Sequence, residues 1–454
     1  MSSENIKQGN PLAEEKIGRL IARFAVPAII SMLVSSLYNI VDQIFIGQGV
    51  GMLGNAATNI AFPVSIICTA TALLLGIGSA SNYNLEAGAG RNDRAAEIAG
   101  NGLAMLVICG VVIGAVVLIF LNPLLHLFGV TKEILPYAQD YTGITAIGIP
   151  FLILTTGGNH LIRADRSPTY SMTCMLTGAI LNTILDPLFI FACHWGIKGA
   201  AAATVIGQVV SGLMVIYYFA RKRKMELKRS MFLPKAGYLK MIVSLGMASC
   251  INQIAMAIVQ ITMNNTLRYY GAQSMYGSEI PLACVGVISK VNMVFMAIAI
   301  GISQGCQPIW NYGRVREAYR KAFAICIVLG VVFFGCFQLF PRQIVSIFGS
   351  GSEAYFHFAE RYFRIFMFVT FLNGIQPMSS GFFTSIGKSK LGIVVSLTRQ
   401  IIFLLPLILI IPLFMGIDGV MYAGPIADGA AALVAIIFAE REMKALQQGN
   451  VVLE

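Results

Sequence analysis

Charged side chains are scarce in this sequence. Asp, Glu, Lys and Arg make up 12% of the 454 residues, whereas apolar residues make up 57% and the mean hydropathy is +0.75. A water-soluble domain of this size could not carry so many apolar residues without aggregating. The composition therefore excludes a soluble domain and predicts an integral membrane protein with many spans.

Histidine is also rare, and cysteine occurs without the spacings that bind metals or form disulfides. The 4 histidines are scattered, and the 9 cysteines fall within or at the end of apolar stretches, with no CxxC pair. Such cysteines are typical of small packing residues, and we expect no metal site built from these residues. The sequence also lacks the GxSxG, HExxH and phosphate-binding loop motifs. These absences disfavour an intramembrane enzyme and an ATP-driven pump, and we expect no bound cofactor.

Apolar stretches long enough to cross a bilayer recur along the chain. A membrane helix needs roughly 20 apolar residues. Residues 1–19 are polar and mixed in charge, so we expect no signal peptide and a first span that stays in the membrane. The predicted spans cover residues 20–47, 56–85, 97–120, 136–164, 168–192, 199–220, 238–268, 279–308, 318–341, 355–385, 390–414 and 419–444.

The basic residues are distributed unevenly between the two sides of these spans. If the amino terminus is cytoplasmic, the cytoplasmic segments hold 23 Lys and Arg residues, including the block RKRKMELKRS at 221–230, against 4 on the opposite side. This positive-inside bias predicts that both termini are cytoplasmic. It also accounts for the net charge of +11, so we expect no nucleic-acid partner.

The two halves of the chain resemble each other. KIGRLIARFAVP at 16–27 aligns with KAGYLKMIVSLG at 235–246, and GIKGA at 196–200 aligns with GIDGV at 416–420. Six spans in each half bring both halves into the membrane from the same side, as in parallel repeats with a cargo cavity between them. We therefore predict an all-α protein of twelve transmembrane helices in two six-helix lobes. The N-lobe covers residues 1–220, a basic cytoplasmic linker covers 221–237, and the C-lobe covers 238–454.

Two acidic residues, Asp42 and Asp186, lie deep in the spans of the first half. An ionised carboxylate in mid-membrane costs about 2.5 to 3.5 kcal/mol, so it needs a partner or a role. Asn182 precedes Asp186 by four positions and shares its helix face. Pro187 lacks an N–H, which frees the carbonyl of Thr183 from its helical hydrogen bond. These residues together predict a cluster of oxygen ligands for a cation.

Further polar residues follow helical spacing in the first and sixth spans. They are Ser31, Ser35, Tyr38, Asn39 and Asp42 in the first span, and Thr204 and Gln208 in the sixth. An alternative is that such stripes are interhelical hydrogen-bonding contacts worth only about 0.6 kcal/mol each. Both interpretations stay open, above all for Thr204 and Gln208.

The second half does not repeat the acidic pair. The counterpart of Asp186 falls in the wholly apolar FLLPLILII, so we expect ion coupling in the first lobe alone. Lys290 is either a structural cation, snorkelling or paired, or a group that faces the cavity. Asp428 is one candidate partner for it and also a candidate residue of the cargo cavity. Met256, Met263 and Met293 either line an adaptable cargo cavity or simply pack.

Several motifs resemble those of one family of transporters. They are LYNIVDQIFIG (37–47), NHLIRADRSP (159–168), LNTILDP (181–187), QGCQPIWNYG (304–313) and GPIAD (424–428). With the two six-helix halves, they resemble the multidrug and toxic compound extrusion (MATE) transporters, most of all the bacterial DinF-like branch, over essentially the whole chain.

The resemblance implies cation-coupled antiport in a bacterial cytoplasmic membrane. Varied, often cationic, organic compounds would leave the cell by alternating access, in exchange for H⁺ or Na⁺. The family's first-lobe cation site matches Asp42, Asn182, Asp186 and Thr204, and a bend of the first helix is expected at Pro27. We expect the protein to be a monomer.

Two other functions remain open at this point. A lipid-linked oligosaccharide or lipid flippase of the same superfamily would be expected to have about fourteen spans and a strongly cationic cavity. A non-transporting membrane protein would not need two repeats with the acidic pair in only one of them.

Overall fold

The computed structural model describes residues 16–165, 167–223, 225, 227–311, 315–349, 351–386 and 388–447. Over these ranges the chain is helical almost throughout, and no strand is formed there. The prediction of an all-α fold is confirmed.

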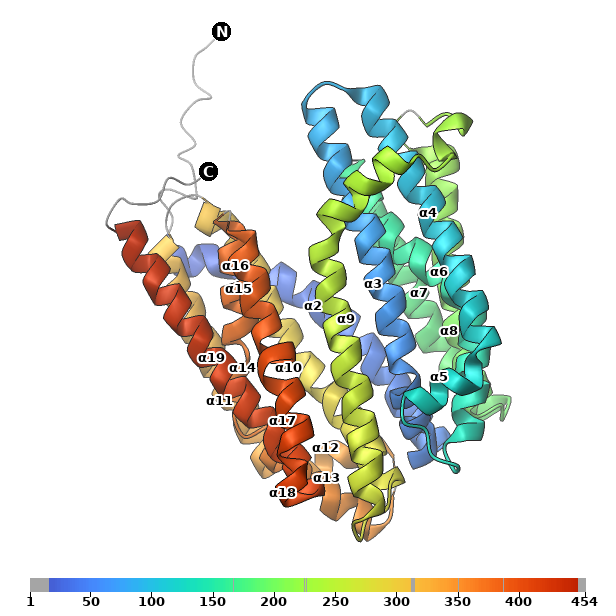
Figure 1. Ribbon diagram of the computed structural model, residues 1–454, viewed down its shortest axis with the longest axis vertical. Helices are drawn as coiled ribbons and strands as arrows, with labels where there is room; N and C mark the ends of the chain where they lie inside the picture. The colour runs from blue at the N-terminus through green and yellow to red at the C-terminus, as the bar shows by residue number, and fades with distance from the viewer. Residues whose placement is uncertain are drawn as a thin grey trace. The chain divides into compact units, whose positions relative to one another are not determined.

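The helices of the first half follow the predicted spans (Figure 1). They are α2 (Ile17–Gly49), α3 (Met52–Gly88), α4 (Asn92–Ile119), α5 (Leu121–Leu127), α6 (Leu135–Ala164), α7 (Pro168–Pro187) with the π-helix η1 (Leu188–Ala192), and α8 (Ile197–Tyr217) with the π-helix η2 (Tyr218–Lys222). A short 3₁₀ helix, η3 (Arg229–Phe232), lies in the predicted linker.

The helices of the second half are more often broken. They are α9 (Ala236–Ala272), α10 (Glu279–Asn311), α11 (Val315–Leu339), α12 (Pro341–Ile347), α13 (Glu353–Phe366), α14 (Thr370–Asn373), α15 (Ile375–Ser385), α16 (Ser389–Leu397), the π-helix η4 (Thr398–Leu404), α17 (Leu405–Ile410), α18 (Pro412–Met415) and α19 (Ile417–Gln447).

Length and composition allow most of these helices to cross a bilayer. Within the described ranges, nine helices are long and apolar enough to cross a membrane. The bent helix α9 is the tenth if its two segments count as one span. The other two predicted spans coincide with α2 and with the broken run α13 to α15. Each of the twelve predicted spans is thus occupied by a helix or a broken helix, as expected for a multi-pass membrane protein.

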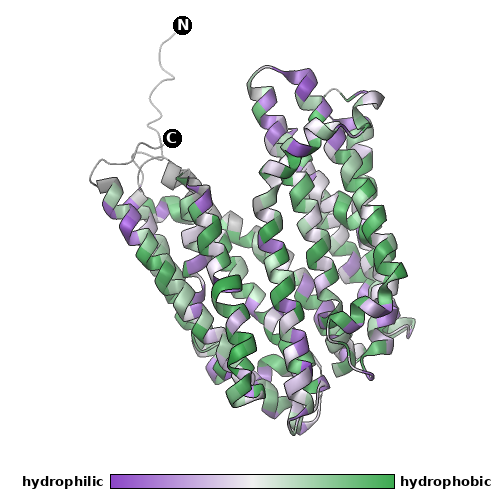
Figure 2. Ribbon diagram, in the orientation of Figure 1, coloured by the Kyte–Doolittle hydropathy of each residue, from purple (hydrophilic) through white to green (hydrophobic). Residues whose placement is uncertain are grey.

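Apolar side chains cover the outer faces of the helices. Figure 2 shows hydrophobic residues along most of their length. Ile119, Leu413 and Phe414 are 73%, 70% and 84% exposed, which would be unfavourable in water. Exposed apolar faces of helices this long fit contact with lipid chains.

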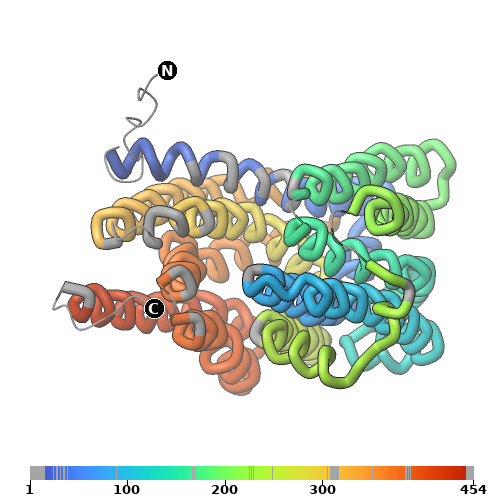
Figure 3. The backbone as a smooth tube through the Cα atoms, turned by 90° about the horizontal axis from the view of Figure 1, so that it is seen from above, coloured from blue at the N-terminus to red at the C-terminus, as the bar shows by residue number. Residues whose placement is uncertain are grey.

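One compact unit, called unit 2 below, consists of residues 41–287 and 346–355. In it α3 packs along α9, and α6 lies against α3, α4 and α8, as Figure 3 lets the reader follow from above. Asn101 of α4 fixes the linker to this unit. Its side chain donates to the carbonyl of Met231 at 3.0 Å and accepts from the backbone N–H of Lys235 at 2.6 Å.

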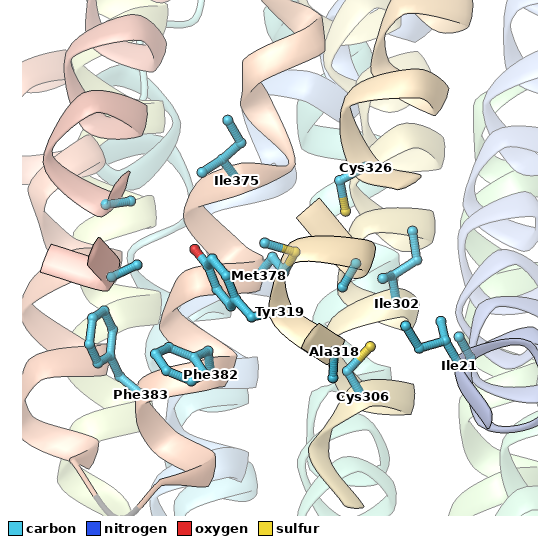
Figure 4. Packing of buried hydrophobic residues seen from close by; sticks show 14 of the residues in the cluster. Ile21, Ile302, Cys306, Ala318, Tyr319, Cys326, Ile375, Met378, Phe382 and Phe383 are labelled. Carbon is cyan, nitrogen blue, oxygen red and sulfur yellow. The ribbon is translucent and has the colours of Figure 1, made fainter. Parts of the chain in front are cut away.

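The other compact unit, unit 1, contains the described residues before Val41 together with 288–345 and 356–447. Its core is an apolar cluster with residues from α2, α10, α11, α15, α16 and α19, of which Figure 4 shows a part. The Tyr319 ring packs on Phe382 at 4.9 Å between centroids, and its hydroxyl lies 2.7 Å from Ser379 Oγ. The aromatic packing therefore links α11 to α15.

The two units do not follow the predicted lobe boundaries. Helix α9 belongs to unit 2 because it packs along α3, and residues 16–40 of α2 belong to unit 1. The lobes at 1–220 and 238–454 are a division by sequence repeat and stay a prediction.

Candidate cation site

The site begins with the close approach of two helices of unit 2. A Cβ at Gly207 of α8 would come within 2.7 Å of the carbonyl oxygen of Gly178 in α7, so only glycine permits this spacing. Small residues allow membrane helices to pack backbone to backbone. Ser211 strengthens the contact by donating to the carbonyl of Cys174 at 2.8 Å. This packing brings the polar residues of α7 and α8 together.

Asp186 is fully buried near the end of α7. Asn182, one turn earlier, donates from Nδ2 to Asp186 Oδ1 at 3.2 Å and to Thr204 Oγ1 of α8 at 3.3 Å. Pro187 follows directly, and the chain then winds as the π-helix η1. Proline and π-helical turns loosen the regular hydrogen-bond ladder and occur often at functional sites. The predicted trio of Asn182, Asp186 and Thr204 is thus in direct contact in the structure.

Asp42 reaches this trio from α2. Its carboxyl group interacts with that of Asp186 electrostatically and within hydrogen-bonding reach. The neighbouring Gln43 holds this part of α2 against α3, because its Nε2 donates to Asn55 Oδ1 at 2.5 Å and to Thr58 Oγ1 at 3.1 Å. The position of Asp42 is therefore fixed by hydrogen bonds of the adjacent residue.

The cluster is rich in acceptors and poor in donors. Among the described residues no basic side chain forms an ion pair with Asp186, and its Oδ2 receives no hydrogen bond from an amide, hydroxyl or basic group. The Oδ1 atom of Asn182 is likewise buried without a donor in that part of the chain. Two close carboxyl groups in a region of low dielectric cannot both remain charged without a cation. This set of oxygen atoms fits a proton or a small cation that prefers oxygen ligands, such as Na⁺.

A small cavity of about 40 Å³ adjoins Thr204. Gln208 and Thr142 also line it, and Gln208 Oε1 and Thr142 Oγ1 are buried there without a partner among the described residues. A polar space of this size is large enough for a water molecule. A cavity that can hold water, bordered by Gln208, therefore lies next to the contact between Asn182 and Thr204.

An apolar cluster borders the site. Ile46 of α2, Ile190 of η1 and Ala200 of α8 form it, and all three are nearly inaccessible to solvent. Phe45 and Phe191 pack edge to face beside it, with 6.2 Å between ring centroids. The cluster excludes water on this side, which strengthens electrostatic interactions at the carboxyl pair.

Other predicted residues of the first half are less directly involved. The Thr183 hydroxyl donates to the carbonyl of Ala179 at 2.9 Å, so it serves its own helix. Asn39 is half-buried in the part of α2 that belongs to unit 1. The side chains of Tyr38 and Pro27 lie outside the described residues, and α2 continues as helix through both positions. The bend predicted at Pro27 stays a prediction.

The second half contains a buried ion pair that sequence reasoning missed. Arg399 of η4 donates from Nε to Asp428 Oδ1 of α19 at 2.5 Å, and the two side chains are 14% and 2% exposed. Asp428 thus pairs with Arg399 rather than with Lys290, the partner considered from the sequence. The usable signal was Arg399, a basic residue well inside the predicted span 390–414.

The candidate cargo residues are divided between the units. Met256 and Met263 lie in unit 2, whereas Lys290, Met293 and Asp428 lie in unit 1. Met263 is buried and the other methionines are half-buried. Their part in cargo binding stays a prediction.

A second polar cluster of unit 2 was also missed. Asn59 Nδ2 of α3 donates to Asn264 Oδ1 of α9 at 3.1 Å and to the carbonyl of Leu282 at 3.2 Å, while Gln260 donates to both asparagines at 3.1 Å. Amide side chains within apolar spans were the available signal. The cluster joins a helix of the first half to one of the second.

The chain is similar to known transporters along most of its length. The MatE family model matches residues 27–188 and again 248–410, which repeats the sequence offset of about 220 residues. The multidrug export protein MepA of Staphylococcus haemolyticus is 24% identical over 430 residues, covering 93% of each chain. An inward-facing multidrug resistance MATE transporter superimposes with a TM-score of 0.83 at 24% identity, over 94% of this chain and 100% of the other. The MATE multidrug transporter DinF-BH, solved in complex with a ligand, superimposes with a TM-score of 0.76 at 33% identity. The match covers 94% of this chain and 96% of the other.

Proposed function

Because the chain belongs to the MatE family of multidrug and toxic compound extrusion (MATE) transporters, we propose that it is a cation-coupled antiporter exporting varied organic compounds. The family model covers most of both halves. Similarity to MepA, a multidrug export protein, and to DinF-BH, a multidrug transporter solved with a bound ligand, supports organic molecules as cargo. The cargo is expected to be cationic because the buried charge of the first-half site is acidic.

One observation carries the coupling proposal: the contact between the carboxyl groups of Asp42 and Asp186, supported by Asn182 and Thr204. A proton shared by the carboxyl pair would neutralise it. Na⁺ would use the same carboxylate oxygens together with Asn182 Oδ1 and the carbonyl of Thr183. Either ion removes negative charge from this part of the protein.

Ion and cargo are then linked through charge. An organic cation near the carboxyl pair is disfavoured when H⁺ or Na⁺ already neutralises it. Because linkage is reciprocal, cargo must weaken ion binding by the same factor. Cargo binding therefore releases the ion and ion binding releases cargo, which is the exchange that an antiporter requires.

The sequence repeat supplies the moving parts of this proposal. The N-lobe at 1–220 and the C-lobe at 238–454 move so that the protein opens to one side of the membrane at a time. Helix α2 bends near Pro27 in response to the state of Asp42. The positive-inside distribution supports cytoplasmic positions for both termini. The protein acts as a monomer, with Met256, Met263, Lys290 and Met293 as candidate cargo contacts.

Equilibrium binding of a cationic dye to the purified protein tests the mechanism. Dye affinity should fall as H⁺ or Na⁺ concentration rises, and this dependence should vanish in Asp42→Asn with Asp186→Asn. A wild-type dye affinity that neither ion changes would exclude competition between ion and cargo.

Gradient-driven uptake of the same dye into inside-out vesicles separates transport from binding. An imposed proton or sodium gradient should drive accumulation, whereas vesicles without the protein should not accumulate dye. Movement of a lipid-linked substrate without any response to the dye or to either ion would favour the flippase alternative.

A further inference from the structure

A second cavity lies in unit 1, between helices that contribute nothing to the carboxyl pair. It has a volume of about 350 Å³ and is bordered by the first turns of α11 and the last turns of α19. The two helices both pack on α15. The lining residues are Arg316, Tyr319, Arg320, Phe323, Ile436, Ala439, Glu440, Met443 and Lys444.

The rim of the cavity carries an excess of positive charge. Among the described lining residues, Arg316 and Arg320, one turn apart on α11, and Lys444 on α19 contribute three cations, against the single carboxylate of Glu440. Within the described part of the chain, none of these four side chains forms an ion pair. The neighbouring Lys321 differs, because it pairs with Glu317 at 2.7 Å and does not line the cavity. Three cationic side chains are thus available to an anionic ligand.

The deeper wall of the cavity is apolar. Phe323 follows Arg320 by three positions on α11, and Ile436 lies one turn before Glu440 on α19, so both are nearer the middle of their spans. The Tyr319 hydroxyl is already bonded to Ser379 and adds no free polar group. The cavity therefore changes from cationic at the helix ends to apolar towards the membrane interior.

We propose that this cavity binds an anionic phospholipid, with the phosphate at Arg316, Arg320 and Lys444 and an acyl chain along Phe323 and Ile436. The ends of α11 and α19 lie on the side that the basic residues assign to the cytoplasm, where anionic headgroups attract basic side chains. A cationic cargo would be repelled here. The ligand joins two helices that meet mainly through α15.

Lipid binding to the purified full-length protein tests the assignment. Native mass spectrometry should show phosphatidylglycerol bound at least about tenfold more tightly than phosphatidylcholine with the same acyl chains. Arg320→Gln should weaken phosphatidylglycerol binding about fivefold, as expected for one basic residue near an anionic headgroup. Glu440→Gln should strengthen it by a similar factor, because the only carboxylate on the described rim is removed.

Lys321→Gln is the matched control. It removes a cation from the same helix, one residue from Arg320, and should leave phosphatidylglycerol binding within twofold of wild type. Arg316→Gln provides a second variant should Arg320→Gln lower the thermal stability of the protein. Each variant is compared only if its elution volume and melting temperature match those of wild type.

Three results would overturn the proposal. Equal affinity for the two lipids would remove the role of charge, and equal loss in Lys321→Gln and Arg320→Gln would remove the role of the cavity. Displacement of phosphatidylglycerol by millimolar inorganic phosphate would show that the cations recognise free phosphate without the lipid chain.

Discussion

The two halves of the chain each bury an acidic side chain, yet they balance its charge in opposite ways. In the first half Asp186 faces Asn182 and a second carboxyl group, that of Asp42. In the second half Asp428 faces the guanidinium group of Arg399 at 2.5 Å. Both carboxylates are almost completely inaccessible to solvent.

This difference agrees with the proposal that the repeated architecture has its exchangeable ion site in the first half alone. A carboxylate beside a covalently attached cation is neutralised permanently, and loss of either partner leaves a buried charge. A carboxylate beside amide oxygens and another carboxylate requires a mobile cation instead. We therefore expect the first arrangement to act on stability and propose that the second responds to the concentration of H⁺ or Na⁺.

Asp186→Asn should abolish gradient-driven efflux while the protein remains folded and inserted. The amide keeps the size of the side chain but removes the charge that we propose holds the coupling ion. We expect the initial rate of dye efflux to fall by about 100-fold, to background. A factor of ten corresponds to about 1.4 kcal/mol, so this loss represents about 3 kcal/mol of coupling.

Asp140→Asn is the control for that experiment. Asp140 pairs with Lys198 at 3.5 Å, and both side chains are well exposed. Exposed pairs contribute little, so transport and stability should stay close to wild type. Full efflux from a well-expressed Asp186→Asn variant would remove the functional contrast between the two acidic residues.

Asp428→Asn should act on stability instead of coupling. It leaves the charge of Arg399 buried without its partner, which costs about 3 to 5 kcal/mol in comparable buried pairs. Denaturant unfolding in detergent micelles measures this cost. The double variant Arg399→Gln with Asp428→Asn should recover most of the lost stability and retain ion-coupled efflux.

The exposed pair of Arg361 and Asp418 provides the matched comparison. Its nitrogen to oxygen distance is 2.7 Å, but Arg361 is 44% exposed. Arg361→Gln should therefore change the free energy of unfolding by less than about 1 kcal/mol. An Asp428→Asn variant as stable as Arg361→Gln would contradict a structural role for the buried pair.

Only part of this difference between the two buried acidic residues could be predicted from the sequence. The twelve spans were predictable because a bilayer imposes a minimum apolar length. The contact between Asn182 and Asp186 was predictable because residues four apart share a helix face. Arg399 and Asp428 are far apart in the chain, and each is a single charge in an apolar run, so no local spacing predicts their pairing.

The breaks in the second half were also beyond sequence reasoning. Hydropathy alone does not distinguish a continuous span from the interrupted run α13 to α15, or an α-helical turn from the π-helix η4 that contains Arg399. The membership of α9 in unit 2 depends on its packing along α3, where a Cβ at Gly246 would collide with the backbone of Leu74. Contacts of that kind depend on shape and not on composition.

Asn182→Ala should weaken ion binding while leaving both carboxylates in place. Asn182 orients Asp186 and Thr204 and contributes an acceptor oxygen, and loss of such supporting contacts commonly lowers cation affinity by about 10-fold to 100-fold. We expect a loss of about tenfold, measured as the ion concentration that halves dye binding. Thr183→Val is the control, because it keeps the backbone carbonyl and removes only a hydroxyl bonded within its own helix. Equal ion dependence in Asn182→Ala and wild type would show that the acidic pair acts without the amide.

Thr204→Val should have the smallest effect, and it distinguishes a ligand from an interhelical hydrogen-bonding contact. Valine keeps the shape of threonine but removes the oxygen that accepts from Asn182 at 3.3 Å and borders the 40 Å³ cavity. If the hydroxyl only joins α7 to α8, the cost is about 0.6 kcal/mol in stability, and the ion dependence of dye binding stays unchanged. If the hydroxyl orients Asn182 for the ion, we expect the half-maximal ion concentration to rise about threefold, which is our prediction. Thr173→Val on α7 is the isosteric control, since its hydroxyl bonds only to the carbonyl of Thr169 among the described residues. An unchanged ion dependence with a loss of stability would restrict the cation site to Asp42, Asp186 and Asn182 and leave Thr204 as a packing contact.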